Sequence, residues 1–242
     1  MFDDLRNPDG ERLDCTFTPA EPSKASNSEL VLLGHGVTAN KDRHWAVTLA
    51  DALARAGFAS LRFSFSGNGD SEGDFRHSTP TKEAVDLGAV LDRCEQWTVT
   101  YVGHSMGAAV GVMRASTDPR ITRLVSLGGM VDTADFAQRK FGELTPGESF
   151  MWDKPECPLS QSFMDDMAAI GSVADLAEGI QRPWLLVHGT DDTVVPIQES
   201  KSILTRAGDF AEFIEMSGAD HVFSGDAARV MANHVVAWLL RQ

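Results

Sequence analysis

The chain has 242 residues, of which 43% are hydrophobic and 23% charged, and its formal net charge at pH 7 is −14. Length and composition predict a globular protein with one sizeable core. The negative charge argues against nucleic acid and an anionic membrane as partners, and it favours neutral over polyanionic substrates. A simpler explanation of the acidic composition is that it only aids solubility.

Short apolar or β-branched runs alternate along the chain with segments of helical periodicity. Residues 13–17 alternate in polarity and predict an antiparallel strand ahead of the main sheet. The further strands expected, in chain order, are 30–33, 59–65, 99–102, 121–127, 184–188 and 210–215. The expected helices are 45–56, 82–96, 106–115, 199–207 and 227–240. This alternation predicts a mostly parallel central sheet flanked by helices.

One long segment, residues 131–180, interrupts the alternation without a convincing strand and is rich in Phe, Trp and Met. Because a structureless loop of this length is improbable in a compact domain, we predict a small helical cap inserted into a single domain of residues 1–242. A cap between two core strands at the carboxyl edge would cover an active site. Its aromatic residues either pack the insertion's own core or contact substrate, and Phe136, Phe141 and Trp152 are the candidate contacts.

The pentapeptide Gly-His-Ser-Met-Gly at residues 103–107 carries the strongest functional signal. It stands between a predicted strand and a helix of small residues, which predicts a sharp elbow with a serine at its apex. Such an elbow exposes the Ser105 hydroxyl as a nucleophile. It also directs the Met106 N–H and the positive end of the following helix at a developing oxyanion.

Residues 69–73 match the same Gly-x-Ser-x-Gly pattern in a different context. No helix follows Ser71, and the flanking Asp70 and Glu72 would oppose an oxyanion. Ser71 is therefore predicted to be a loop residue, and Ser105 the nucleophile.

Two later segments supply candidates for an acid and a base. Asp192 follows the predicted strand 184–188, where a carboxylate could orient a histidine and stabilise its imidazolium form. The adjacent Asp191 competes for this role, and Asp132 is a more distant candidate. His221 lies in a glycine-containing loop before the last helix and has the chain order expected of the general base.

The segment that follows the first long strand offers a second oxyanion donor. A glycine at position 36 lets the backbone approach a ligand, and the Val37 N–H is the predicted donor. His35 and His104 are further candidates for substrate contact, with turn or packing roles as the alternative.

Three cysteines, far apart in the chain, show neither a disulfide framework nor zinc-ligand spacing. We expect no cofactor and no metal. The N-terminus lacks a signal pattern and no segment approaches membrane-spanning length, which predicts a cytoplasmic protein without membrane insertion. Exposed cap aromatics could equally serve a homodimer contact.

Together these motifs resemble the α/β-hydrolase superfamily, through residues 103–107, 188–189, 192, 195–196 and 218–221. Residues 35–41 and 63–73 are most similar to small bacterial carboxylesterases of the cinnamoyl/feruloyl-esterase-like group and to serine-aminopeptidase-like hydrolases. The resemblance runs from about residue 30 to the C-terminus. It implies an eight-stranded, mostly parallel sheet with a helical cap.

The sequence thus predicts a serine carboxylesterase that cleaves a small-molecule ester, with an aryl or medium-chain acyl group, through an acyl-enzyme. Its catalytic residues would be Ser105, Asp192 and His221, with the Val37 and Met106 N–H groups as the oxyanion hole. The alternatives are another acyl hydrolase (amidase, peptidase or thioesterase) or a non-catalytic binding protein of the same fold.

Overall fold

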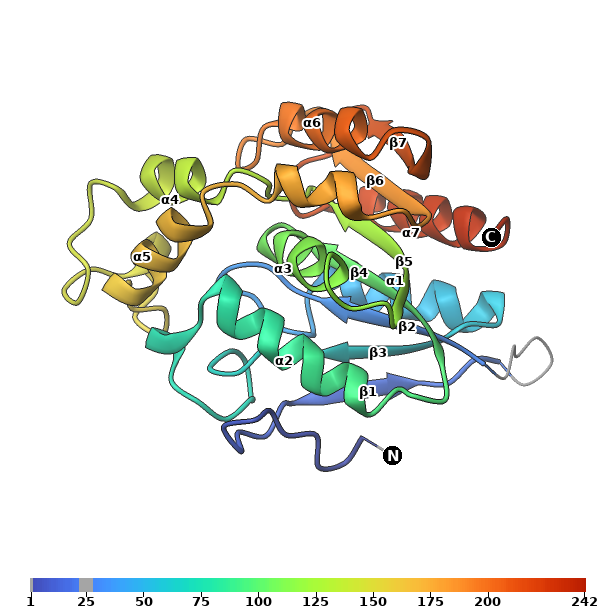
Figure 1. The fold of residues 1–242 in the computed structure, drawn as a ribbon, viewed down its shortest axis with the longest axis horizontal. Coiled ribbons are helices and arrows are strands. Elements are labelled where there is room, and N and C mark those ends of the chain that lie inside the picture. The colour runs from blue at the N-terminus through green and yellow to red at the C-terminus, as the bar shows by residue number, and fades with distance from the viewer. Residues whose placement is uncertain (1, 22–27) are drawn as a thin grey trace.

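The computed structural model describes residues 2–21 and 28–242, and its centre is a sheet with helices on both faces (Figure 1). The described residues form seven strands, paired in the order β1-β3-β2-β4-β5-β6-β7. All pairs are parallel except β1 with β3. The strands are β1 (Cys15–Thr18), β2 (Glu29–Gly34), β3 (Ala59–Phe63), β4 (Thr98–His104), β5 (Ile121–Leu127), β6 (Trp184–Gly189) and β7 (Ala211–Met216).

The mostly parallel sheet confirms the predicted fold class, but the expectation of eight strands is wrong for the described residues. The chain ahead of β1 forms turns and one isolated bridge between Arg6 and Arg12. There the Asn7 side-chain oxygen accepts hydrogen bonds from the Asp9 and Glu11 N–H groups, at 3.1 and 3.0 Å. Because these bonds hold the backbone in a turn, it forms no further strand, and β1 is the edge of the sheet.

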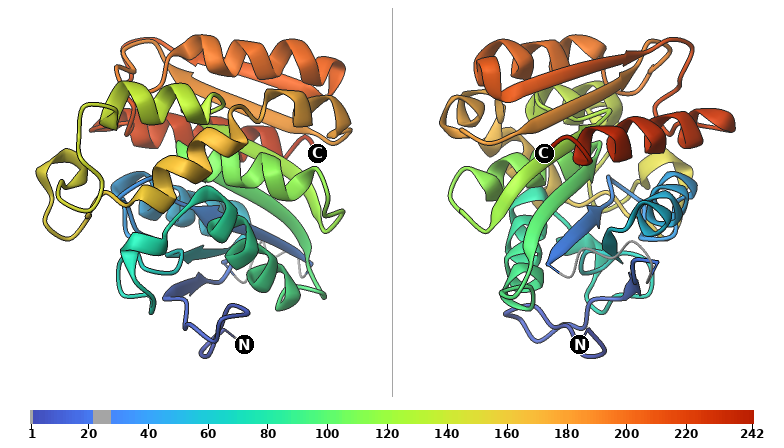
Figure 2. Two further views of the ribbon diagram at one scale, coloured as in Figure 1. Left: turned by 60° about the vertical axis from the view of Figure 1, so that its left-hand side comes forward. Right: turned by 90° about the vertical axis from the view of Figure 1, so that its right-hand side faces the viewer.

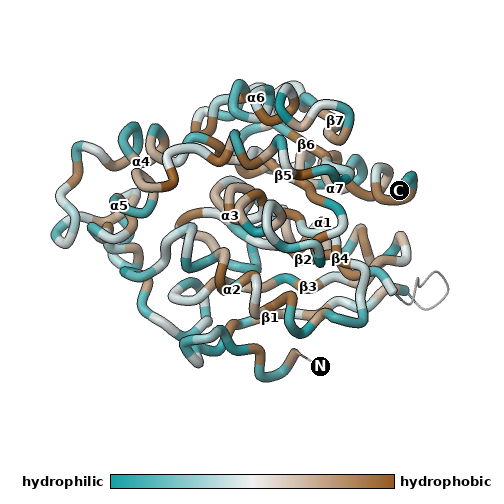
Figure 3. The backbone as a smooth tube through the Cα atoms, viewed as in Figure 1, coloured by the Kyte–Doolittle hydropathy of each residue, from teal (hydrophilic) through white to brown (hydrophobic). Residues whose placement is uncertain are grey.

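The inner strands are buried on both faces, and their residues alternate between two cores. In β2, Leu30 and Leu32 pack into one hydrophobic cluster, whereas Val31 and Leu33 pack into the other. None of the four is more than 1% exposed. This double burial explains why the strands read as continuous apolar runs. Figure 3 shows hydrophobic residues concentrated along these strands and recurring along the helices that cover them.

One face of the sheet carries α1 (His44–Ala56) and α7 (Asp226–Leu239), which pack against each other. The opposite face carries α2 (Pro80–Asp92), α3 (Met106–Ala115) and α6 (Ile197–Ala207). The right-hand view of Figure 2 shows helices on both sides of the sheet. None of the helices in the described ranges combines the length and hydrophobicity needed to cross a bilayer.

Two helices, α2 and α6, begin two residues before their predicted starts, for local reasons. The Thr79 side chain accepts a hydrogen bond from the Lys82 N–H, and Pro80 occupies the first turn of α2, where its missing N–H is not needed. Pro196 likewise precedes α6 directly.

Residues 133–170 form helical elements at one end of the sheet (Figure 1, left), with one isolated bridge between Phe150 and Pro158, and residues 174–179 form a short helical turn that packs against α6. The elements are α4 (Thr133–Phe141), η2 (Met151–Asp153), α5 (Gln161–Ile170) and η3 (Ala174–Gly179); two further short turns lie elsewhere, η1 (Phe75–His77) and η4 (Gly208–Phe210). A third hydrophobic cluster holds the insertion together and includes Met106 at the start of α3. The insertion therefore packs directly against the elbow.

Candidate active site

Ser105 lies between the end of β4 and the start of α3, in a backbone conformation that non-glycine residues rarely adopt. Its φ is 54° and its ψ is −121°. Such strain persists only where the surroundings enforce it. A Cβ on Gly103 would overlap the Gly107 carbonyl, and one on Gly107 would overlap the His35 carbonyl. The two flanking glycines are thus required for the close approach of backbone segments at the elbow.

Replacing Gly107 with alanine is expected to destabilise the protein by about 1–3 kcal/mol, because the new Cβ meets fixed backbone of the chain after β2. It would also lie 2.8 Å from the Gly34 carbonyl oxygen. Gly179→Ala is the control, since nothing lies within 4 Å of a Cβ there. Urea unfolding measures both variants. Equal stability of Gly107→Ala and the wild type would show that this backbone approach can relax.

His221 and Asp192 are hydrogen-bonded, with 2.7 Å between His221 Nδ1 and Asp192 Oδ2. The other carboxylate oxygen, Oδ1, accepts from the N–H groups of Val194 and Val195, both at 2.8 Å. The Asp192 side chain is only 1% exposed. Because a carboxylate accepts, His221 Nδ1 carries the proton and Nε2 is left with a lone pair.

His188 is a second histidine on the same carboxylate. Its Nε2 lies 3.2 Å from Asp192 Oδ2 and 3.0 Å from the Val195 carbonyl oxygen, and its Nδ1 lies 2.7 Å from Ser200 Oγ. Since both Nε2 partners are acceptors, Nε2 carries the proton. Burial acts to raise the pKa of Asp192, but hydrogen bonds from His188 and His221 outweigh it and hold that pKa well below its ordinary value. Asp192 is therefore ionised at neutral pH.

The structure separates Asp192 from the other acidic candidates. Asp191 is exposed and its carboxylate accepts from the Thr190 hydroxyl at 3.0 Å. Asp132 precedes α4, and its N–H donates to Glu199. Asp220, next to the histidine in sequence, accepts from the Ser224 N–H at 2.8 Å.

Ser71 is held in its loop by two hydrogen bonds. Its hydroxyl donates to the Ser64 carbonyl oxygen and accepts from the Asp14 N–H, each at 2.8 Å. It does not line the cavity at Ser105.

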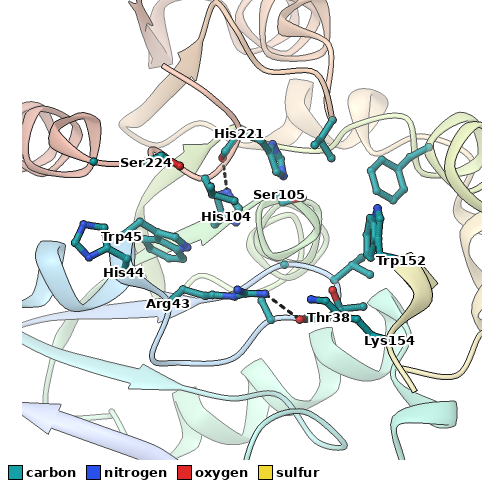
Figure 4. Close-up of a pocket in the computed structure, with 17 residues that line it drawn as sticks. Thr38, Arg43, His44, Trp45, His104, Ser105, Trp152, Lys154, His221 and Ser224 are labelled. Atoms are coloured by element: carbon teal, nitrogen blue, oxygen red, sulfur yellow. Dashed lines mark hydrogen bonds between the residues drawn. The ribbon is translucent and has the colours of Figure 1, made fainter. Parts of the chain in front are cut away.

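A cavity of about 410 Å³ opens at Ser105, within the size range of small-molecule sites. Figure 4 shows His221 next to Ser105 in this cavity. The lining residues are Gly36, Val37, Thr38, Ala39, Arg43, His44, Trp45, His104, Ser105, Phe136, Trp152, Lys154, Val194, His221, Val222, Ser224 and Gly225.

The two candidate oxyanion donors flank the serine. Val37 lines the cavity and follows Gly36, where an added Cβ would stand 2.7 Å from Ser105 Cβ. Met106 is the first residue of α3, and the first N–H groups of a helix have no partner within it. The Met106 side chain itself is buried in the cluster of the insertion.

Of the five predicted substrate contacts, His104, Phe136 and Trp152 line the cavity, and His35 and Phe141 do not. His35 Nδ1 bonds the Gly36 carbonyl at 2.9 Å and its Nε2 accepts from the Phe65 N–H at 3.0 Å, so it braces the turn. Burial lowers the pKa of His35 to about 4, which leaves it neutral. Phe141 is 1% exposed and makes edge-to-face ring contacts with Phe136, Trp152 and Phe163.

His104 links the elbow to the loop of His221. Its Nε2 donates to the His221 carbonyl oxygen at 2.8 Å, and burial is the main reason that its pKa is lowered to about 3. The imidazole therefore stays neutral and holds the backbone of the candidate base in place.

Glu199, which the sequence analysis missed, fixes the start of the insertion. Its Oε2 accepts from the N–H groups of Val131 and Asp132, at 2.6 and 3.0 Å. Its position in the first turn of α6, directly after the Asp192 loop, was the only available sequence signal.

Comparison with known proteins identifies the family of the chain. Residues 29–154 match the model of the alpha/beta hydrolase fold family. The chain is 23% identical over 240 residues to uncharacterized protein YfhR of Escherichia coli strain K12, covering 96% of this chain and 78% of that protein. It is 26% identical over 175 residues to human palmitoyl-protein thioesterase ABHD10, mitochondrial, covering 66% of this chain and 56% of that protein.

Two solved structures share the whole architecture. Est1E from Butyrivibrio proteoclasticus with bound ferulic acid superposes with a TM-score of 0.84 at 22% identity, covering 100% of this chain and 98% of that one. Mouse alpha/beta hydrolase domain-containing protein 10 does so with a TM-score of 0.78 at 19% identity, covering 96% and 94%. These likenesses show a common fold, and the family model spans more than half of the sequence. The chain belongs to the alpha/beta hydrolase fold family.

Proposed function

We propose that the protein is a serine hydrolase that cleaves a carboxylic ester of a small molecule through an acyl-enzyme. One observation carries the proposal: a single cavity holds Ser105 on its strained elbow and His221, whose Nδ1 is bonded to the buried, ionised Asp192 at 2.7 Å. A nucleophile, a base with a free Nε2 and a group that orients this base are the parts that acyl transfer requires.

In the first half of the reaction, Ser105 Oγ attacks the ester carbonyl carbon and its proton passes to His221 Nε2. Asp192 stabilises the imidazolium that forms. The negative charge on the carbonyl oxygen is bound by the N–H groups of Val37 and Met106. Collapse of this intermediate breaks the bond to the alcohol, which leaves with the proton from His221.

The second half repeats these steps with water. Water attacks the acyl-enzyme, gives a proton to His221, and the acid is released as Ser105 recovers its proton. Residues 131–180 would serve as the cap of the single domain, because Phe136, Trp152 and Lys154 from this segment line the cavity together with Ser105. The apolar surfaces of Phe136 and Trp152 favour an aryl or medium-chain acyl group over acetyl.

The test is hydrolysis of p-nitrophenyl esters of increasing acyl length and of methyl ferulate, beside a thioester and a p-nitroanilide with the same acyl group. The expected result is turnover of esters, with kcat/KM rising from acetate to the longer or aryl acyl groups. A preference for the thioester or the anilide would overturn the ester assignment within the same mechanism. No turnover of any substrate would favour a binding protein of this fold.

A further inference from the structure

The cavity at Ser105 differs in charge from the rest of the molecule. The chain has 35 acidic residues and 21 Lys and Arg, yet Arg43 and Lys154 line the cavity and no Asp or Glu does. The two cations come from distant parts of the sequence, one before α1 and one in the insertion. Figure 4 shows both on the side of the cavity where Thr38 lies. The fold thus builds a local positive site inside an acidic protein.

Neither cation is neutralised by the protein. Among the residues that the structure describes, neither Arg43 nor Lys154 pairs with a carboxylate, whereas Arg62, Lys82 and Arg120 all do. Arg43 donates one hydrogen bond, from Nη2 to the Thr38 carbonyl oxygen at 3.1 Å. The rest of its guanidinium donors and the Lys154 ammonium are therefore available to a ligand.

The backbone adds to the positive charge on this side. Helix α1 begins at His44, beside Arg43, without a capping side chain and without an acidic residue in its first turn. His44 and Trp45, its first two residues, line the cavity. The partial positive charge of this helix end therefore acts at the same wall as the guanidinium.

Most of the remaining wall of the cavity is apolar. Trp45, Phe136, Trp152 and Val194 line the same cavity as the serine and the two cations. Such a wall suits a hydrocarbon spacer, and in its low-polarity surroundings a cation gains more from an anionic partner than it does in water. Trp152 and Asp153 both have positive φ, 49° and 56°, directly before Lys154, so the insertion holds this lysine through a strained turn.

We propose that the substrate is an ester that also carries an ionised carboxylate, and that Arg43 and Lys154 bind this second group. The inference rests on the proposed function and names its substrate class. The net charge of −14 favours neutral substrates for the chain as a whole, whereas the lining of the cavity favours an anionic one. Because surface charges more than about 10 Å apart are screened at 0.1 M salt, carboxylates remote from the cavity affect an anionic group bound there less than Arg43 and Lys154 do.

The test compares substrates that differ only in charge. Monoethyl adipate is paired with ethyl adipamate, which replaces the carboxylate by a neutral amide of the same size. A second pair, 5-acetoxypentanoate and 5-acetoxypentanamide, places the charge on the alcohol side of the ester. In at least one pair kcat/KM for the anion is expected to exceed that for the amide by about tenfold, as two charge-assisted contacts would give. This preference should fall in 0.5 M NaCl.

The variants Arg43→Gln and Lys154→Gln, singly and together, identify the groups responsible. Each single variant is expected to lower kcat/KM for the anionic ester several-fold. In the double variant, the ratio of kcat/KM for the anion to kcat/KM for the amide should be near one. Lys201→Gln is the matched control, since it removes the same charge from a lysine on α6 that pairs with Glu215 outside the cavity. Arg43→Lys should recover part of the preference, and thermal unfolding checks that every variant is folded.

Binding to Ser105→Ala, measured by calorimetry with the same four esters, separates this inference from the proposed function. Equal turnover and equal binding of anion and amide, or a preference that persists in the double variant, would overturn the inference while ester hydrolysis stands. Preferential binding of the anion without turnover of any ester would overturn the proposed function instead.

Discussion

Replacing Ser105 with alanine is expected to lower kcat for p-nitrophenyl butyrate by about 10⁴-fold or more. The variant loses the hydroxyl that the proposed mechanism acylates, while the cavity, the His221–Asp192 pair and the N–H groups of Val37 and Met106 remain. Alanine only removes the hydroxyl oxygen and adds no atom that the elbow must accommodate, so the fold should persist. Stopped-flow absorbance measures the turnover, and mass spectrometry of trapped protein should locate the acyl group on Ser105 in the wild type alone.

Ser71→Ala is the matched control, because Ser71 occupies the same position in the second Gly-x-Ser-x-Gly match. Its hydroxyl makes two hydrogen bonds within the loop, to Ser64 and Asp14. The substitution should therefore cost about 1–2 kcal/mol of stability and leave kcat almost unchanged. Activity that survives in Ser105→Ala and is lost in Ser71→Ala would reverse the assignment of the nucleophile.

The second large effect is expected from Asp192→Asn, at about 10⁴-fold in kcat. The Val194 and Val195 N–H groups both point at Oδ1, so the asparagine must place its carbonyl oxygen there. Its NH₂ group then faces Nδ1 of His221 and Nε2–H of His188. His221 must then accept at Nδ1, which puts its proton on Nε2 and leaves no lone pair to take the serine proton.

Asp191→Asn is the control for this prediction. Asp191 is exposed and bonds only the Thr190 hydroxyl through its side chain, so its amide should alter kcat less than about twofold. The steady-state kinetics of both variants with one p-nitrophenyl ester decide the point. A large loss in Asp191→Asn with little change in Asp192→Asn would transfer the orienting role to the neighbouring residue.

The pattern of the sequence predicts the layers of this fold because strands buried on both faces must be apolar throughout. Residues such as Leu30 and Val31 serve two different cores and so leave an unmistakable run. Helix ends depend on single capping groups instead, and the bond from Lys82 to Thr79 set the start of α2 where periodicity did not.

The candidate catalytic residues were predictable because they follow strand ends, where the topology gathers them. The sequence separates Asp191 from Asp192 poorly, because a shift of one position along the chain changes which carboxylate turns inward. In the structure, the hydrogen bonds from the Val194 and Val195 N–H groups hold Asp192 in the inward position. Arg43 and Lys154 left no signal at all. The two residues, 111 positions apart in the sequence, come to one site only in the fold, where both line the same cavity.

Glu199 attaches the start of the insertion partly through backbone groups. The Oε1 atom of this buried carboxylate, which lies outside the insertion, is 3.7 Å from Arg139 Nη2 in α4, and its Oε2 anchors the first residues of the segment through the backbone N–H groups of Val131 and Asp132. Every amino acid except proline supplies such a group. Any residue other than proline at positions 131 and 132 therefore retains these two bonds, whereas the segment contributes Phe136, Trp152 and Lys154 to the cavity through their side chains. One part of the attachment is thus independent of side-chain identity, so the residues that line the cavity can change without altering it.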